Sequence, residues 1–396
     1  MTFASGNPSW GIEFHGGMTK TEKLLCELIA LPSVNPAFLP GASARCGEGR
    51  VSAFLADAAA RAGLSVELQK VGPAAGNRSN LIVKLAPPQA PRCRILLAPH
   101  LDTVPGMSEE QYVPKTQGGR IYGRGACDTK GSVAAMFAAL CQLAARGPRP
   151  TETEIVFAGL ADEEHLQVGS RGLAASGFKA DLAIVGEPTR LKIVTAHKGS
   201  LWLGLETRGV AAHGSRPELG RNAIHEMAQA VCLLEEDYSR ELRRRRHPVL
   251  GCGTVNVGVM AGGTQPNIVP DVCRASVDRR LLPGETAKSA CQEMAELFRR
   301  RKLRVKVVDQ KGAPGLPMET DVRLPQVRKF FAVAGQKKTA GVDYYCDAAV
   351  LAEGGIPSVV FGPGDVAQAH TADEWIARAS LEAATNLLVK YLRSLP

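Results

Sequence analysis

Two histidines and a set of carboxylates stand in short motifs, each beyond an apolar run of the sequence. They are His100 and Asp102, Asp128, the trio from Asp162 to Glu164, Glu187, and His370. Each lies past the carboxyl end of an expected strand, which is where open α/β sheets place their ligand sites. We therefore expect these side chains to share one crevice.

Carboxylates gathered in one crevice repel each other, and a divalent metal ion is the natural counter-charge. Two imidazoles with three or four carboxylates suit zinc, and the set is large enough to hold two ions. A pair of such ions can activate a water to attack a carbonyl. A carboxylate that does not bind metal must then take the proton, and the adjacent Glu163 and Glu164 offer one base and one ligand.

Each motif also has an ordinary structural explanation when taken alone. A His-x-Asp pair is usually a surface pair, and an acidic trio is usually a solvated loop. The glycine-rich loop at 123–131 fits neither phosphate-binding motif, because the order is Lys130-Gly131-Ser132 and because Asp128 stands where a dinucleotide fingerprint has Gly or Ala. The metal-site hypothesis therefore depends on the joint placement of the motifs.

The elements that must position these residues follow two patterns. Strands alternate with helices between residues 20 and 187, which predicts an α/β fold with a mostly parallel sheet. After Glu187 the order becomes β-β-α-β-β-α-β, with a strand expected at 191–196 and a helix at 222–238. This second pattern indicates a small α+β domain built on an antiparallel sheet.

These patterns predict one discontinuous domain and one insert. We expect a catalytic domain of residues 18–194 and 311–396, interrupted by the α+β domain at residues 195–310. Residues 1–17 are glycine-rich and patternless, and we expect them to form a flexible extension.

Composition indicates an ordinary globular protein with a basic excess. Of 396 residues, 45% are hydrophobic and 22% charged, and 48 Lys and Arg against 39 Asp and Glu give a net charge of +9. Such an excess suits nucleic acid, an anionic membrane or an anionic substrate. Only 5% of residues are aromatic, which argues against a base-stacking surface. The arginine runs at 243–246 and 299–301 end expected helices, so we expect solvated helix ends, no nucleic-acid partner and no membrane partner.

The ten cysteines include no Cys-x-x-Cys pair and stand mostly in apolar stretches. They favour small buried hydrophobes in a reducing compartment. No signal peptide is visible, and the longest apolar helix, at 133–145, is too short to cross a bilayer. We therefore expect a cytoplasmic protein.

Taken together, five motifs resemble those of the co-catalytic zinc deacylases and carboxypeptidases, a family that includes acetylornithine deacetylase and succinyl-diaminopimelate desuccinylase. The motifs are His100-Leu101-Asp102-Thr103-Val104-Pro105, Gly123 to Gly131, Asp162-Glu163-Glu164, Gly186-Glu187-Pro188-Thr189, and Gln368 to Glu374. The resemblance covers residues 20–396.

The resemblance implies two zinc ions, for which Co²⁺ or Mn²⁺ could substitute. His100, Asp128 and Glu187 would hold one ion. Asp128, Glu164 and His370 would hold the other, so that Asp128 bridges the two.

The resemblance also implies the remaining roles in the crevice. Glu163 would be the general base and then the acid that protonates the leaving amine. Asp102 would orient His100. The peptide bond between Asp128 and Thr129 would be cis.

The insert resembles the lid and dimerisation domain of the same family. His213 would reach the active site of a partner subunit and stabilise the oxyanion there, which implies a homodimer. Asn267, in the segment from Gly262 to Pro270, would polarise the substrate. Arg280 would bind the substrate carboxylate, a task suited to a guanidinium group.

The resemblance implies hydrolysis of a small N-acyl amino acid. The segments Gly186 to Thr189, Ala196 to Gly199 and Gly362 to Gly364 are more similar to acetylornithine deacetylase than to the desuccinylase. A metallo-carboxypeptidase or dipeptidase acting on small peptides with the same metal centre remains the alternative. A basic nucleic-acid-binding protein is the more remote one.

Overall fold

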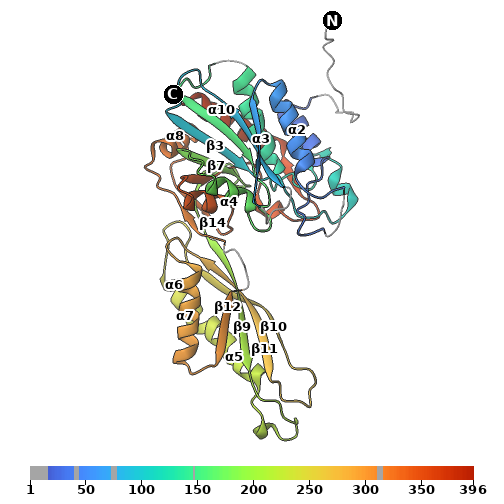
Figure 1. Cartoon of the computed structure of the whole chain (residues 1–396), viewed down its shortest axis with the longest axis vertical. Coiled ribbons are helices and arrows are strands. Elements are labelled where there is room, and N and C mark those ends of the chain that lie inside the picture. Colours follow the sequence, from blue (N-terminus) through green and yellow to red (C-terminus); the bar gives the residue numbers. More distant parts are fainter. Residues whose placement is uncertain (1–16, 40–43, 73–77, 146–147, 310–314) are drawn as a thin grey trace.

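The computed structural model describes residues 17–39, 44–72, 78–145, 148–309 and 315–396. The extension expected at residues 1–17 lies outside them, apart from Gly17. Figure 1 shows two bodies, an α/β domain and a narrower domain that projects from it. We call the second body the lid.

A mixed, mostly parallel sheet forms the centre of the α/β domain, as the sequence predicts. Its nine strands follow the order β1-β2-β6-β3-β7-β15-β8-β13, with β14 beside β8. The central strands β6, β3, β7 and β15 pair in parallel, and β1 and β2 add an antiparallel edge. The bounds are Ser65–Lys70 (β1), Ser79–Leu85 (β2), Cys93–Pro99 (β3), Thr153–Gly159 (β6), Leu182–Gly186 (β7), Val194–His197 (β8), Met318–Glu319 (β13), Ala340–Val342 (β14) and Ser358–Val360 (β15).

Helices cover both faces of this sheet because its strands are apolar on both sides. On β3, Ile95 and Leu97 face one core, while Leu96 and Ala98 face the other. The first core is closed by α1 (Lys20–Ile29), α2 (Gly49–Arg61), α3 (Lys130–Ala145), α8 (Pro325–Ala334) and α10 (Arg378–Arg393). The second is closed by α4 (Val168–Ala175) and α9 (Asp347–Glu353). A small sheet joins β4 (Lys115–Gln117), β5 (Arg120–Tyr122) and β16 (Trp375–Ala377).

The lid is a four-stranded antiparallel sheet with helices on one face. The strand order is β10-β11-β9-β12, with bounds Gly199–Arg208 (β9), Thr254–Gly262 (β10), Val272–Leu281 (β11) and Val305–Asp309 (β12). Leu203 and Val277 point to the helical face, where they pack with Met227 and Phe298. The helices are α5 (Ala223–Leu233), α6 (Ser239–Arg244) and α7 (Ala287–Arg300). The chain enters the lid at Lys198, between β8 and β9.

Two expected elements differ from the structure. The helix expected at 222–238 begins as α5, loosens into a π turn at Leu234–Tyr238 and continues into α6 as far as Arg244. The strand expected at 191–196 begins only at Val194, because Arg190 and Leu191 adopt left-handed backbone conformations, with φ of 54° and 63°.

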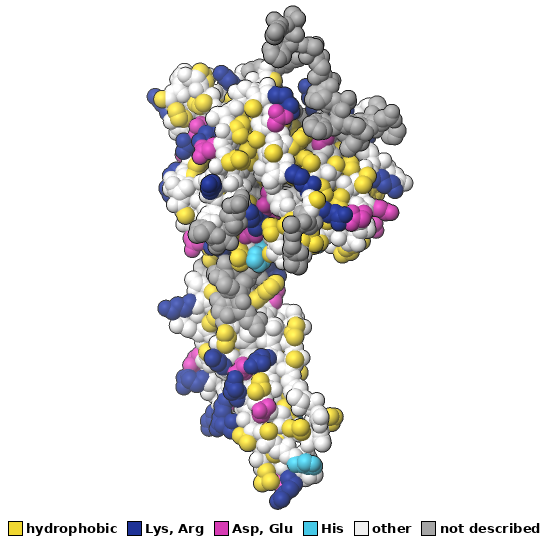
Figure 2. All heavy atoms as spheres, turned by 45° about the vertical axis from the view of Figure 1, so that its right-hand side comes forward, with side chains coloured by type: hydrophobic (Ala, Val, Ile, Leu, Met, Phe, Trp, Pro, Cys, Tyr) yellow, Lys and Arg dark blue, Asp and Glu magenta, His cyan; other side chains and the backbone are white. Residues whose placement is uncertain are grey.

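Lys and Arg side chains gather on one side of the lid in Figure 2. Carboxylates are interleaved with them: Arg301 pairs with Asp237 and Arg299 with Glu296 at 2.7 Å. The arginine runs therefore form a mixed ionic surface at the ends of α6 and α7. Within the described ranges, no helix is long and apolar enough to cross a membrane.

Candidate dinuclear metal site

Three neighbouring strands deliver most of the predicted metal ligands to one edge of the sheet. His100 follows β3, Glu164 follows β6 after a short turn, and Glu187 follows β7 directly. Because β6, β3 and β7 are adjacent and parallel, their carboxyl ends meet at the same edge. Asp128 comes from the loop before α3, and His370 from the loop after β15.

Two groups of ligand atoms form here, and Asp128 belongs to both. His100 Nε2 lies 3.1 Å from Asp128 Oδ1 and 3.8 Å from Glu187 Oε1. His370 Nε2 lies 3.4 Å from Asp128 Oδ2 and 3.2 Å from Glu164 Oε2. Within each group the ligand atoms all lie within 4.8 Å of one another. Each oxygen of Asp128 therefore faces a different group, as a bridging carboxylate requires.

The electrostatics of the crevice favour bound cations. Burial raises the pKa of Glu163, Glu164 and Glu187, and the negative charges of neighbouring carboxylates raise it further. Glu187 Oε1 has no hydrogen-bond partner among the described residues, although it is buried. A buried acceptor without a donor costs free energy unless a cation faces it. Imidazole and carboxylate donors in this number fit zinc.

Two histidines bring positive charge to the carboxylates of the crevice. Hydrogen bonds to Asp128 and Glu164 raise the pKa of His370 to about 10. Burial opposes protonation of His100, but Asp102 and Asp128 raise its pKa well above the usual value. Burial would also raise the pKa of Asp128, but hydrogen bonds with both histidines lower it. Bound metal ions would replace these protons at the ring nitrogens.

Asp102 holds the loop that carries the acidic pair. Its carboxylate accepts hydrogen bonds from the backbone N–H groups of Glu163 at 3.1 Å and Glu164 at 3.2 Å, and from Asn35 Nδ2 at 2.7 Å. His100 Nδ1 lies 3.0 Å from the backbone oxygen of Asp102 and 3.5 Å from its carboxylate. That contact leaves His100 Nε2 facing the ligand cluster.

A further buried pair, Arg124 and Glu374, organises the loop of Asp128. Glu374 accepts hydrogen bonds from the backbone N–H groups of Gly125 (3.0 Å), Cys127 (2.8 Å) and Asp128 (2.9 Å). Arg124 Nη1 donates to the same carboxylate at 2.7 Å. Both side chains are almost fully buried. Glu374 ends the motif that contains His370, but the sequence alone gives it no role.

The peptide bond between Asp128 and Thr129 is cis, as the resemblance implies. Thr129 Oγ1 donates a hydrogen bond of 2.7 Å to the backbone oxygen of Gly186. This contact joins the loop of Asp128 to the residue that precedes Glu187.

Asp347 is a further carboxylate that the sequence analysis missed. It is fully buried at the start of α9, and Ser170 Oγ donates a hydrogen bond of 2.5 Å to its Oδ1. Burial, together with the charges of nearby acidic groups, raises its pKa to about 7. Its negative charge in turn raises the pKa of Glu163 and Glu187.

The three lid residues lie in two different places. Arg280 pairs with Ser200 across the sheet, close to where the chain enters the lid, and forms an ion pair of 3.0 Å with Asp278. His213 and Asn267 lie in the loops beyond β9 and β10, where Gly214 N donates to Asn267 O at 2.7 Å. Strand β9 spans ten residues, which is about 30 Å.

His213 and Asn267 therefore lie together at the end of the lid far from the α/β domain (Figure 1). The structure places them near each other but not beside the metal ligands of the same chain. Of the three lid residues, Arg280 is the one that lies at the end where the chain enters the lid, opposite Ser200. Tyr345 lies within electrostatic reach of both Arg280 and Glu163.

Fold and crevice together define a metal-dependent hydrolase that acts on amide or peptide bonds. Residues 96–394 match the model of peptidase family M20/M25/M40, and the chain belongs to this family. The family has a dinuclear metal site, which agrees with two ligand groups that share Asp128.

Similar proteins agree with this assignment. The chain is 30% identical over 374 residues to acetylornithine deacetylase of Vibrio cholerae serotype O1, covering 91% of this chain and 96% of that one. It is 32% identical over 336 residues to acetylornithine deacetylase of Myxococcus xanthus, covering 80% and 84%.

Among solved structures, aminopeptidase PepT of Bacillus cereus shares the fold with a TM-score of 0.75 and 23% identity, over 95% of this chain and 99% of that one. A metallo-carboxypeptidase of Sulfolobus solfataricus, from the M20 family, has a TM-score of 0.73 and 18% identity, over 95% and 99%.

Glu374→Gln tests the role of the Arg124–Glu374 pair. The change leaves Arg124 buried without its counter-charge, which we expect to destabilise the fold by about 3 kcal/mol. It also loosens the loop of Asp128, so metal affinity should fall roughly 10- to 100-fold. Competition with a chromogenic chelator measures affinity, and denaturant unfolding measures stability. Asp373→Asn, at the exposed neighbouring residue, is the control, and an equal effect of both variants would contradict the assignment.

Proposed function

We propose that this protein is a zinc-dependent amidohydrolase that removes the acyl group from an N-acyl amino acid, as acetylornithine deacetylase does. One observation carries the proposal: two ligand groups share Asp128, and a carboxylate outside both groups, Glu163, lies beside them. The relatives named acetylornithine deacetylase support the deacylase assignment over a peptidase. A succinyl group in place of the acetyl group is the variant of this proposal.

Each residue of the crevice has a role in this reaction. His100, Asp128 and Glu187 would hold one zinc ion, and Asp128, Glu164 and His370 would hold the other. When bound, zinc polarises the amide carbonyl and allows a water to act as nucleophile at neutral pH. Co²⁺ or Mn²⁺ would fill the same donor set.

Glu163 carries the proton in this scheme. It takes the proton released by the attacking water and passes it to the leaving amine. Glu163 belongs to neither ligand group, so its carboxylate stays free to accept and return a proton. Asp102 positions Glu163 through its hydrogen bond to the backbone N–H.

The lid completes the site in the proposal. Arg280, at the near end of the lid, binds the substrate carboxylate. His213 and Asn267 lie at the far end, so they serve the crevice of a second subunit in a homodimer that forms through the lid. None of the ten cysteines, all of which lie within the described residues, forms a disulfide, which fits the reducing cytoplasm.

A metallo-carboxypeptidase or dipeptidase is the second candidate. Arg280 would serve it as well as the deacylase, because a short peptide and an N-acyl amino acid both end in a carboxylate. The metal groups and Glu163 would serve both reactions. The two candidates therefore differ only in the group that precedes the scissile amide.

A substrate panel separates the candidates. The protein reconstituted with zinc is offered N-acetyl-ornithine, N-succinyl-diaminopimelate and dipeptides, and release of the free amine is measured. We expect hydrolysis of an N-acyl amino acid with the highest kcat/KM. Hydrolysis of dipeptides alone would replace the deacylase proposal with the peptidase one.

Glu163→Gln should abolish turnover while both metal ions stay bound. The glutamine side chain cannot accept the proton, but residue 163 belongs to neither ligand group, so all the metal ligands remain. Metal content by elemental analysis and turnover on the preferred substrate are measured together. Glu110→Gln, at an exposed residue, is the matched control. Loss of a metal ion in Glu163→Gln would show that base and ligand have been confused.

His213→Ala should lower kcat about a hundredfold without loss of metal if His213 donates to the oxyanion. His225→Ala, at an exposed histidine on α5, is the control. Mixing His213→Ala subunits with Glu163→Gln subunits should restore part of the activity, since one mixed crevice then has both groups. No recovery in proven mixed dimers would contradict a role across subunits.

A further inference from the structure

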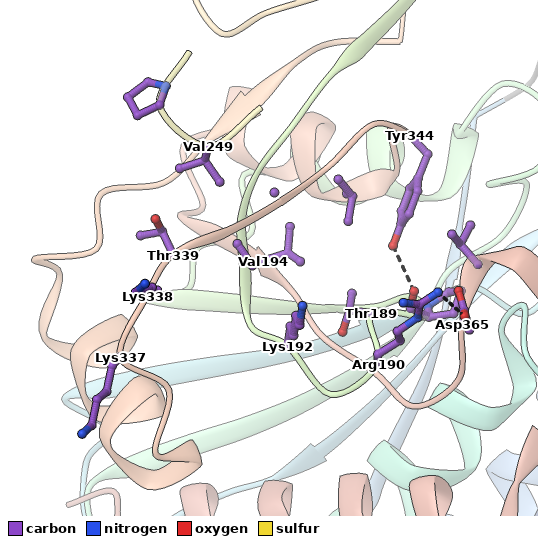
Figure 3. A pocket seen from close by; sticks show the side chains of 16 residues that line it. Thr189, Arg190, Lys192, Val194, Val249, Lys337, Lys338, Thr339, Tyr344 and Asp365 are labelled. Carbon is purple, nitrogen blue, oxygen red and sulfur yellow. Dashed lines mark hydrogen bonds and ion pairs between the residues drawn. The ribbon is translucent and has the colours of Figure 1, made fainter. Parts of the chain in front are cut away.

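A hollow of about 820 Å³ lies at the junction of the α/β domain and the lid, outside the metal ligands (Figure 3). Three segments line it: 188–194, 337–344 and Pro248 with Val249 of the lid. Asp365 and Val366 complete the wall. The volume suits a small molecule.

The charged side chains around this hollow are mostly cationic. Arg190, Lys192, Lys337 and Lys338 line it, with Asp365 as the acidic residue. Arg190 forms an ion pair with Asp365. Among the described residues, none of the three lysine ammonium groups has a hydrogen bond or an ion pair. In Figure 3, Lys192 points toward the open space and Lys337 extends away from it.

Hydrogen bonds hold the segments that carry these cations in a fixed relation. The Gln336 side chain accepts from Ile193 N at 2.8 Å and donates to Ile193 O at 2.8 Å and to Lys338 O at 2.9 Å. It therefore fastens the residue after Lys192 to the segment of Lys338. Arg190 N donates to Gly364 O at 2.8 Å. The backbone around the hollow is thus organised before any ligand binds.

The same hollow contacts both the lid and the segment of a metal ligand. On the lid side, Gly341 packs so closely that an added Cβ would lie 2.5 Å from Leu250 Cδ2 and 3.0 Å from Val249 Cγ1. On the other side, Tyr344 Oη donates to Pro188 O at 3.3 Å, directly after Glu187. A ligand here would touch the lid and the α/β domain together.

We propose that this hollow binds a small dianion, a phosphate or a dicarboxylate, and that the bound anion stabilises the observed arrangement of lid and α/β domain. Lys192 and Lys338 supply unpartnered ammonium groups, and Arg190 retains N–H donors beyond those that face Asp365. A ligand that contacts both domains favours the arrangement in which those contacts exist. This site is separate from the amide hydrolysis proposed above and does not depend on it.

Calorimetric titration of the metal-loaded protein with inorganic phosphate, and separately with malonate, tests the site at constant ionic strength. We expect saturable binding of one anion at the hollow. Lys192→Gln with Lys338→Gln should weaken it roughly tenfold or more, since two cationic charges that line the hollow are lost. The control, Lys70→Gln with Lys288→Gln, removes the same charge from exposed positions elsewhere and should bind as the wild type does.

The remaining outcomes show which kind of anion binds and whether it binds in the hollow. Binding of phosphate alone identifies a phosphorylated ligand, while binding of both probes identifies an anion site that accepts carboxylates. Thermal unfolding should show that the anion raises the Tm of the wild type and of the control but not of the Lys192/Lys338 variant. Equal affinity in all three proteins, or no saturable binding, would overturn the proposal, because any binding would then occur at the metal centre or through diffuse charge.

Discussion

The mutual repulsion of buried carboxylates is the constraint on which the rest of this structure depends. Five acidic groups share the crevice: Asp128, Glu163, Glu164, Glu187 and Asp347. Two histidines offset only part of this charge, which explains why burial and like charges raise the pKa of four of the five. Bound cations would offset the electrostatic cost of such a cluster. The surrounding fold keeps the carboxylates from relaxing apart.

That surrounding support consists of buried polar pairs rather than apolar packing. Arg78 pairs with Asp162 at 2.6 Å, and Asn35 joins Asp162 to Asp102. On the opposite side, Arg124 and Glu374 hold the loop of Asp128. Each of these buried pairs holds a segment of backbone in place, and that segment positions the side chain of a candidate metal ligand. This arrangement explains how loops that follow different strands reach one common geometry.

That these side chains gather in one crevice can be predicted from the sequence, because the rule behind their placement is local. A polar residue directly after a buried parallel strand, as with His100 and Glu187, can be found from the strand alone. Glu374 could not be found this way, since its role appears only when it meets Asp128, 246 residues away in the chain. Asp347 gave one weak signal, an acidic residue opening an apolar helix. The late start of β8 depends on the left-handed backbone at Arg190 and Leu191, which neither residue type favours.

The lid also behaves as a lever. Strand β9 carries the chain from Lys198 to its far loops in one run of ten residues, and helices α5 and α7 stiffen the sheet along one face. Over an arm of about 30 Å, a rotation of about 10° at the hinge displaces the far end by about 5 Å. A small rotation of the backbone near Lys198 would thereby become a displacement of several ångströms, about 5 Å for about 10°, at the far loops. The position of His213 therefore depends on the backbone at Lys198, where the chain enters the lid, as well as on the loop that carries it.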